Sequence, residues 1–162
     1  MSLPVINTPT YELVVPSTKE KLVYRPFLVK EEKILLMAME DGNEDNIIRS
    51  VRQIVTNCTF EKIDANDIPT FDLEYIFLRI RAKSVGEVST VNILCQDDEK
   101  TYVKVDIPLE EVEVQFVKDH SKEIKLTNDI MVEMKYPTFE MIQKLGDGTA
   151  EQVFNLVGQC VN

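Results

Sequence analysis

Residues 24–36 read YRPFLVKEEKILL, and this stretch decides the N-terminal part of the fold. A short strand of alternating apolar side chains ends at Pro26, because proline has no N–H to donate to a strand ladder. The following residues are typical of a helix. Glu31 and Glu32 fall in its first turn, where the helix dipole favours negative charge. We therefore expect a strand that ends at Pro26, followed directly by a helix over about 28–39.

The residues before this stretch predict a β-hairpin. Residues 11–15 and 21–25 are rich in Val, Leu and Tyr, and the sequence PSTK at 16–19 is typical of a turn. Residues 1–10 contain two prolines and show no clear pattern, so we expect an extended arm there.

Two further helices are expected before the pattern changes. The first of them, over about 44–57, has the clearest helical period in the chain. Its apolar face consists of Ile47, Ile48, Val51, Ile54, Val55 and Cys58. The second, over about 71–83, should begin after Thr70, because threonine is a common N-cap. Residues 11–84 therefore predict a hairpin plus three helices.

From Gly86 onward the apolar residues follow a period of two, which is typical of half-buried strands. A charged turn is expected at 97–100. The alternating runs are residues 88–95, 102–107, 112–116, 124–126 and 130–134. Because short strands separated by turns usually pair with their neighbours, we expect one antiparallel meander over residues 86–136.

Residues 137–162 predict C-terminal helices. The sequence PTFEM at 137–141 should begin one helix, residues 146–148 should break it, and a final amphipathic helix should begin near Thr149. The apolar stripe of that helix stops abruptly, so we expect the native chain to run on beyond Asn162. Since helices and strands come in separate runs, the chain predicts a single α+β domain over 1–162.

The composition disfavours several classes of partner. The chain has 18 basic and 28 acidic residues, and its net charge of −10 opposes binding to nucleic acid and to anionic membranes. No apolar stretch approaches the ~20 residues that a membrane-spanning helix needs. The cysteines Cys58, Cys95 and Cys160 lie far apart, which favours a reduced intracellular chain over a disulfide scaffold. We expect neither nucleic acid nor a membrane as partner.

No catalytic, metal-binding or cofactor-binding site is predicted. The one histidine, His120, lies in a polar stretch beside Asp119 and Ser121. Sequence neighbours seldom form a catalytic triad, since triad partners usually come from distant segments. No CxxC pair is present, so the usual spacing of zinc ligands is missing. The five glycines form no phosphate-binding loop.

Four segments of the chain resemble one protein family. They are residues 24–36, NTPTYEL at 7–13, the run from PTFD at 69–72 to Gly86, and KYPTF at 135–139. These segments are similar to the baseplate hub subunits and hub-assembly proteins of T-even-type contractile-tail bacteriophages. The resemblance implies a protein that builds part of a phage tail and catalyses no reaction.

The resemblance also implies where the protein acts and with which partners. Such a protein is expected to dock to other phage baseplate hub proteins in the host bacterial cytoplasm during assembly. It would then either stay in the virion tail baseplate or leave it, as an assembly chaperone does. Two alternatives stay open: a zinc-stabilised adaptor with ligands beyond Asn162, and a tail enzyme that modifies the cell envelope. A homo-oligomer would explain the stretch 34–39, which is apolar on all sides.

Two surfaces are candidates for partner binding. The first is the charged strand-to-helix junction, and its residues are Arg25, Phe27, Lys30, Glu31 and Lys33. The second is an open sheet edge at the expected strand 112–116, and its residues are Val112, Val114 and Phe116. The junction also has a purely structural interpretation, in which Pro26 ends the strand and Phe27 packs as a hydrophobic staple against the helix.

Overall fold

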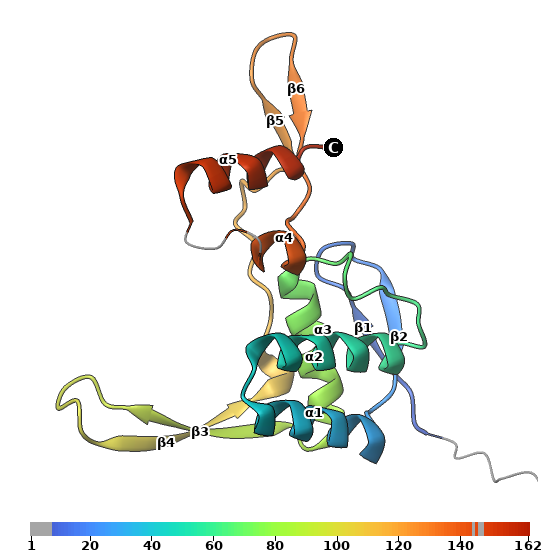
Figure 1. Cartoon of the computed structure of the whole chain (residues 1–162), viewed down its shortest axis with the longest axis vertical. Coiled ribbons are helices and arrows are strands. Elements are labelled where there is room, and N and C mark those ends of the chain that lie inside the picture. Colours follow the sequence, from blue (N-terminus) through green and yellow to red (C-terminus); the bar gives the residue numbers. More distant parts are fainter. Residues whose placement is uncertain (1–7, 144, 146–147) are drawn as a thin grey trace, which may run out of the picture.

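The computed structural model describes residues 8–143, 145 and 148–162. Within these residues a strand pair and three helices come first, two further strand pairs follow, and two short helices come last (Figure 1). This order confirms the expected α+β class. Most of the arm expected at 1–10 and two residues of the break expected at 146–148 lie outside the described residues.

Strands β1 (Tyr11–Val14) and β2 (Lys21–Tyr24) form the expected antiparallel hairpin. Leu13 pairs with Leu22, and both side chains are buried. Because alternate residues of a strand point to the same face, this register directs one face of the hairpin towards the helices.

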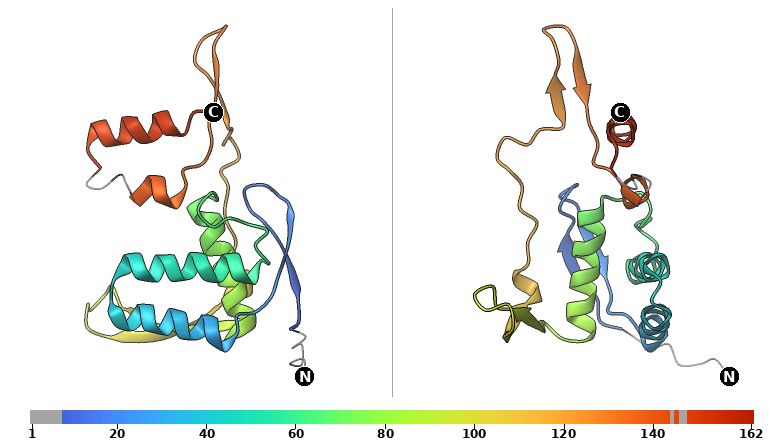
Figure 2. Two further views of the ribbon diagram at one scale, coloured as in Figure 1. Left: turned by 45° about the vertical axis from the view of Figure 1, so that its right-hand side comes forward. Right: turned by 60° about the vertical axis from the view of Figure 1, so that its left-hand side comes forward.

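Helices α1 (Val29–Asp41), α2 (Glu44–Cys58) and α3 (Thr70–Ser84) match the three expected helices to within two residues at each end. Helix α1 ends at Gly42, whose φ of 66° lies in the left-handed region that glycine adopts without steric cost. The side chain of Asn43 then caps α2. Helices α1 and α2 lie side by side, and α3 runs across them (Figure 2).

The core lies where β1, β2, α2 and α3 meet. Its buried residues are Leu13, Val15, Leu22, Tyr24, Ile54, Val55, Cys58, Ala65, Leu73, Ile76 and Ile80. Only the C-terminal part of the predicted face of α2 is fully buried, since Ile47, Ile48 and Val51 are half-buried. Burial of one isoleucine side chain stabilises a fold by about 1.5–3 kcal/mol, so the buried side chains of α2 and α3 outweigh any single surface contact.

The N-terminus of α3 differs from the prediction. Pro69 rather than Thr70 is the N-cap, and the Thr70 hydroxyl oxygen is buried with no hydrogen-bond partner among the described residues. Asp72 in the first turn instead holds the β1–β2 turn, because its carboxylate accepts from the Ser17 N–H at 3.1 Å and from the Ser17 hydroxyl. This carboxylate therefore ties the hairpin to the helix.

The later strands are antiparallel as expected, but they form separate pairs rather than one sheet. Strand β3 (Val88–Leu94) pairs with β4 (Tyr102–Pro108), and β5 (Glu123–Lys125) pairs with β6 (Met131–Glu133). Together with β1–β2 this gives three two-stranded sheets within the described residues.

The strand expected at 112–116 is wrong, because these residues, all of them described, pair with no other strand. A short 3₁₀ helix, η1 (Leu109–Glu111), precedes them. The guanidinium of Arg79 on α3 donates to the carbonyl oxygen of Glu110 at 2.7 Å and to that of Val112 at 3.2 Å. These bonds hold the start of the segment against α3, and one of them occupies the Val112 carbonyl oxygen, which a strand partner would need.

Helices α4 (Phe139–Gln143) and α5 (Ala150–Gln159) are the expected C-terminal helices. Helix α5 begins next to Thr149, as the sequence predicts, and the Thr149 side chain caps it. After α5 the chain returns to β6, where the Asn162 N–H donates to the Glu133 carbonyl oxygen at 3.0 Å. Figure 1 shows the β5–β6 hairpin and α5 at one end of the molecule and the β3–β4 hairpin near the other.

Candidate functional site

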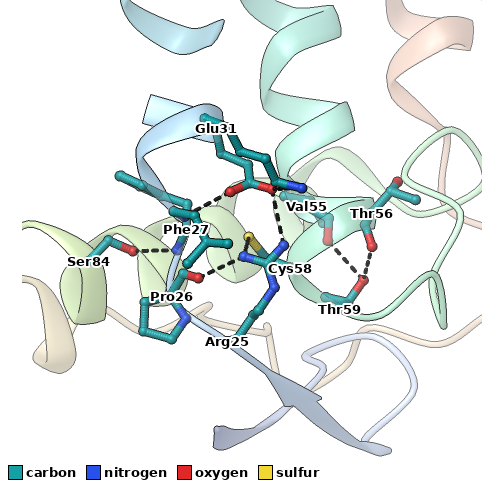
Figure 3. Close-up of polar contacts among 11 residues, drawn as sticks. Arg25, Pro26, Phe27, Glu31, Val55, Thr56, Cys58, Thr59 and Ser84 are labelled. Carbon is teal, nitrogen blue, oxygen red and sulfur yellow. Dashed lines mark hydrogen bonds and ion pairs between the residues drawn. The ribbon is translucent and has the colours of Figure 1, made fainter. Parts of the chain in front are cut away.

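The strand-to-helix junction encloses a buried ion pair (Figure 3). Arg25 follows β2 and Glu31 lies in the first turn of α1, and Arg25 Nη2 donates to Glu31 Oε1 at 3.0 Å. Glu31 has no exposed surface, and Arg25 is also buried. The Lys30 ammonium lies 3.4 Å from the same oxygen. Two cations therefore compensate one buried carboxylate, as burial of a charge requires.

The second oxygen of Glu31 caps α1. It accepts from the Leu28 N–H at 2.8 Å, which is the carboxylate half of a capping box. Burial raises the pKa of Glu31, but the hydrogen bonds from Arg25 and Leu28 and the positive charges of Arg25 and Lys30 outweigh this effect. The net pKa lies below its usual value, so the carboxylate is ionised at neutral pH.

Arg25 also joins the junction to α2. Its Nη1 donates to the Pro26 carbonyl oxygen at 3.0 Å and lies 3.6 Å from the Cys58 sulfur, while its backbone N–H donates to the Cys58 carbonyl oxygen at 2.9 Å. Burial raises the pKa of the Cys58 thiol to about 11. A protonated, buried thiol packs as an apolar group and is a poor nucleophile. The junction thus links β2, α1 and α2.

The structure divides the first predicted surface. Arg25 and Glu31 point inward and neutralise each other, so the expectation that Glu31 faces a partner is corrected. Phe27 is partly buried and packs against the core. Lys30 and Lys33 are exposed. Partner binding by these two lysines stays a prediction.

The second predicted surface is not an open sheet edge. Phe116 lies edge-on to Phe71 of α3, with 5.9 Å between ring centroids, and the Lys19 ammonium lies 4.4 Å from the Phe116 centroid. Val112 and Phe116 are 38% and 39% exposed, and Val114 is half-buried. These residues cover α3 and reach the β1–β2 turn, and their contact with a partner stays a prediction.

Large apolar side chains are exposed on most of the remaining elements. On α1 they are Val29, Leu36, Met37 and Met39. On later helices and strands they are Val88, Ile93, Leu94, Tyr102, Val103, Val105, Ile124, Met131, Ile142, Val153, Phe154 and Val157. Within the first group, the all-round apolar stretch 34–39 signals Leu36, Met37 and Met39 but not Val29. The sequence signals the strand residues by their alternation, but alternation alone does not reveal that no second layer of the described residues covers them.

The single histidine lies at an apolar pocket of about 360 Å³. The ring of His120 stacks on that of Tyr136, with 5.5 Å between centroids. The apolar lining residues are Ile124, Met134, Pro137, Leu156, Val157 and Cys160. The stacked pair therefore forms one wall of a pocket between α5 and the base of the β5–β6 hairpin.

Residues 8–143, 145 and 148–162 contain neither a cluster typical of a metal site nor a membrane-spanning helix. In these ranges no three His, Cys, Asp or Glu side chains are close enough together to hold a metal ion. No helix in the same ranges has both the length and the apolar character to cross a membrane.

Comparison with known proteins gives the family. Neither a curated protein nor a solved structure matches the chain. The model of one protein family, described as T4 bacteriophage base plate protein, matches residues 8–162. This match covers the strand-to-helix junction, the three helices and both later hairpins, and it confirms the resemblance to phage baseplate proteins. The chain therefore belongs to the T4 bacteriophage base plate protein family.

Proposed function

We propose that the protein is a non-catalytic structural or assembly subunit of the baseplate hub, which acts by docking to other hub proteins. The observation that carries this proposal is the exposure of large apolar side chains on α1 and on the elements after residue 85. Exposed apolar surface of this kind marks protein interaction sites. Family membership implies that the partners are other phage baseplate proteins.

Helix α1 offers a docking face beside the junction. Val29 and Leu36 are seven residues apart and therefore lie on the same side of the helix, with Lys33 between them. Met37 and Met39 flank this side and are exposed. Methionine side chains adapt to irregular partner surfaces. The predicted partner-binding residue Lys33 thus lies within an apolar surface.

The buried ion pair gives this docking face a fixed position. The Arg25–Glu31 contact and the cap on the Leu28 N–H fix the start of α1 relative to β2, and Arg25 also bonds to Cys58 at the end of α2. A face that is already ordered loses less conformational entropy on binding. We therefore assign the inward-facing charges of the junction to positioning α1 and the outward-facing side chains of α1 to contact.

We propose that docking takes place in the host bacterial cytoplasm during assembly and that the protein then resides in the virion tail baseplate. Mass spectrometry of purified virions tests the second step. A structural subunit should be present at a fixed ratio to other baseplate proteins. Its absence from virions, together with binding to hub proteins in the infected cell, would identify an assembly chaperone instead.

Co-expression with the other baseplate hub proteins of the same phage, followed by size-exclusion chromatography with light scattering, tests the docking. We expect a stable complex whose mass gives the stoichiometry. Leu36→Gln with Met37→Gln should weaken this complex, whereas Arg49→Gln with Gln53→Asn, exposed on α2 and away from this face, should not. A wild-type chain that binds none of these proteins would contradict the proposed function. Normal binding by the Leu36→Gln, Met37→Gln variant would exclude the α1 face as a contact surface and leave the proposed function standing.

A further inference from the structure

The middle of the β3–β4 hairpin has one apolar and one polar face. Its register pairs Val91 with Val105 and Ile93 with Val103, and alternation places these four side chains on the same face as Ile107. In the middle of the other face Thr90 lies opposite Asp106 and Asn92 opposite Lys104, whereas the end pairs of that face are Val88 with Pro108 and Leu94 with Tyr102. The hairpin is therefore amphipathic, like a strand pair that covers a core.

The polar pairs in the middle of the hairpin interact with each other or with solvent, whereas much of the apolar face is exposed. On the polar face the Thr90 hydroxyl donates to Asp106 Oδ1 at 2.6 Å. On the apolar face Ile93 is 49% and Val103 50% exposed, and Ile107, near the base of the hairpin, is half-buried. Figure 1 shows the hairpin extending away from the helices. A two-stranded hairpin is at best marginally stable in water, so a covering surface would stabilise it.

The tip of the hairpin carries a fixed negative charge. Residues 97–100 comprise three acidic residues and one lysine. The Asp98 carboxylate accepts from the N–H groups of Lys100 and Thr101 at 3.1 and 3.0 Å and from the Thr101 hydroxyl. The Thr101 hydroxyl, its N–H and the Lys100 N–H, in that order, lower the pKa of Asp98 to about 2. The tip is therefore anionic at every pH near neutrality.

We propose that the apolar face of β3–β4 (Val91, Ile93, Val103, Val105 and Ile107) docks an apolar surface of another baseplate protein that bears basic residues opposite the tip at 97–100. This proposal rests on the proposed function and specifies one of its contact surfaces. Charge complementarity favours a basic partner over a second copy, because two copies would bring together two chains of net charge −10 and two anionic tips. Attraction between the tip and the partner should accelerate association at low salt.

Paired substitutions on the two faces test the assignment. Ile93→Thr with Val103→Thr keeps β-branched side chains, and therefore strand propensity, while it makes the apolar face polar. Asn92→Thr with Lys104→Thr is the matched control. This cross-strand pair is next to Ile93–Val103 and lies on the polar face. We expect the first variant to weaken binding to the hub partner by about tenfold or more, and the control to change it by less than about twofold. Circular dichroism and thermal unfolding verify that both variants fold.

A tip variant tests the charge of the partner. Asp97→Asn with Glu99→Gln should lower the association rate in about 0.05 M salt, and this loss should largely disappear in about 0.5 M salt, because salt screens exposed charges. Asp98 is left unchanged, since it holds the turn together. An unchanged or faster association rate of this variant at low salt would overturn the proposal that the partner is basic.

The outcomes separate this inference from the proposed function. If the wild-type complex forms and the Ile93→Thr, Val103→Thr variant binds equally well, the hairpin face is excluded and the hub function stands. If the wild type binds no baseplate protein, the hub function fails, and this docking fails with it. A dimer of the isolated chain that this variant abolishes would show a second copy as the occupant and overturn the proposal. As a second measurement, hydrogen exchange of the β3 and β4 amides should slow in the complex, and unchanged exchange there would also overturn it.

Discussion

Residues 11–84 bury their apolar side chains against one another, whereas residues 86–162 leave most of theirs exposed. All residues of the core cluster come from the first region, and most of the exposed large apolar residues come from the second. The second region consists of two projecting hairpins and two short helices (Figure 1). We infer from this comparison that the first region supplies most of the stability. The second region supplies exposed apolar surface, and its hairpins and helices depend more on a covering partner to stay ordered.

The largest loss of stability should come from Glu31→Gln. The substitution leaves Arg25 buried without its counter-charge, and removal of one partner from a buried ion pair costs about 3–5 kcal/mol. Glu32→Gln, on the exposed neighbour, should change the free energy of unfolding by less than about 0.5 kcal/mol. Urea unfolding followed by circular dichroism measures both. Equal effects of the two substitutions would show that the buried pair does not stabilise the junction.

Truncation of one isoleucine in each region tests the comparison directly. Ile76→Ala in α3 removes a fully buried side chain and should lower the free energy of unfolding by about 2–5 kcal/mol. Ile93→Ala in β3 removes a half-exposed one and should cost about 1 kcal/mol or less in the isolated chain. A similar loss for both would mean that the hairpin is part of the stabilising core. If the proposed docking is right, the cost of Ile93→Ala should rise in a complex with the baseplate partner.

The dependence of stability on pH should reveal the contribution of the buried Glu31 carboxylate. The pKa of Glu31 is lowered from 4.5, so its contribution to stability is present above pH 4.5 and is lost as the pH falls through the folded-state pKa. The difference in unfolding free energy between wild type and Glu31→Gln should therefore shrink below pH 4.5. Urea titrations from about pH 3 to pH 7 measure this difference. A constant difference would show that ionisation of Glu31 is not the source of the stabilisation.

The contribution of Asp72 to stability should depend on pH in the opposite direction to that of Glu31. Burial raises its pKa above 3.8 despite the hydrogen bonds from Ser17 and the charge of Lys19. Its contribution is therefore present below pH 3.8 and is lost as the pH rises through the folded-state pKa. Asn is neutral at every pH. The free energy of unfolding of the wild type relative to Asp72→Asn should therefore decrease as the pH rises from 3.8 through the folded-state pKa of Asp72. The same titrations measure it, and a rise instead of a fall would contradict the raised pKa.

The sequence predicts the first region well because its signals are local. Pro26 ends a strand, Gly42 ends a helix, and the helical period at 44–57 needs no distant partner to be recognised. The strand expected at 112–116 is wrong because alternation does not show which group takes the backbone carbonyl oxygens. Here the side chain of Arg79, more than 30 residues earlier, donates to the carbonyl oxygen of Val112 at the start of the expected strand and to that of Glu110 just before it.

The candidate site was only partly predictable for the same reason. The sequence correctly puts Glu31 in the first turn of α1, but a charge in a first turn usually stays in solvent. Its burial depends on Arg25 from the end of β2 and on the packing of Cys58 from α2. Neither contact follows from spacing within the helix. In contrast, the β3–β4 face is exposed because no other part of the described chain covers it, and no local pattern encodes this.

The smallest changes in stability should come from two threonines at the starts of helices, one in each region, and the two should differ from each other. The Thr149 hydroxyl accepts from the Gln152 N–H at the start of α5, so Thr149→Ala should destabilise that helix by about 1 kcal/mol. The Thr70 hydroxyl is buried without a partner among the described residues, and Thr70→Val keeps its shape, so this change should be neutral or slightly stabilising. Hydrogen exchange resolves the two helices: amides of α5 should exchange about fivefold faster in Thr149→Ala, while those of α3 stay as slow in Thr70→Val. Faster exchange in α3 would show that the Thr70 hydroxyl caps that helix after all.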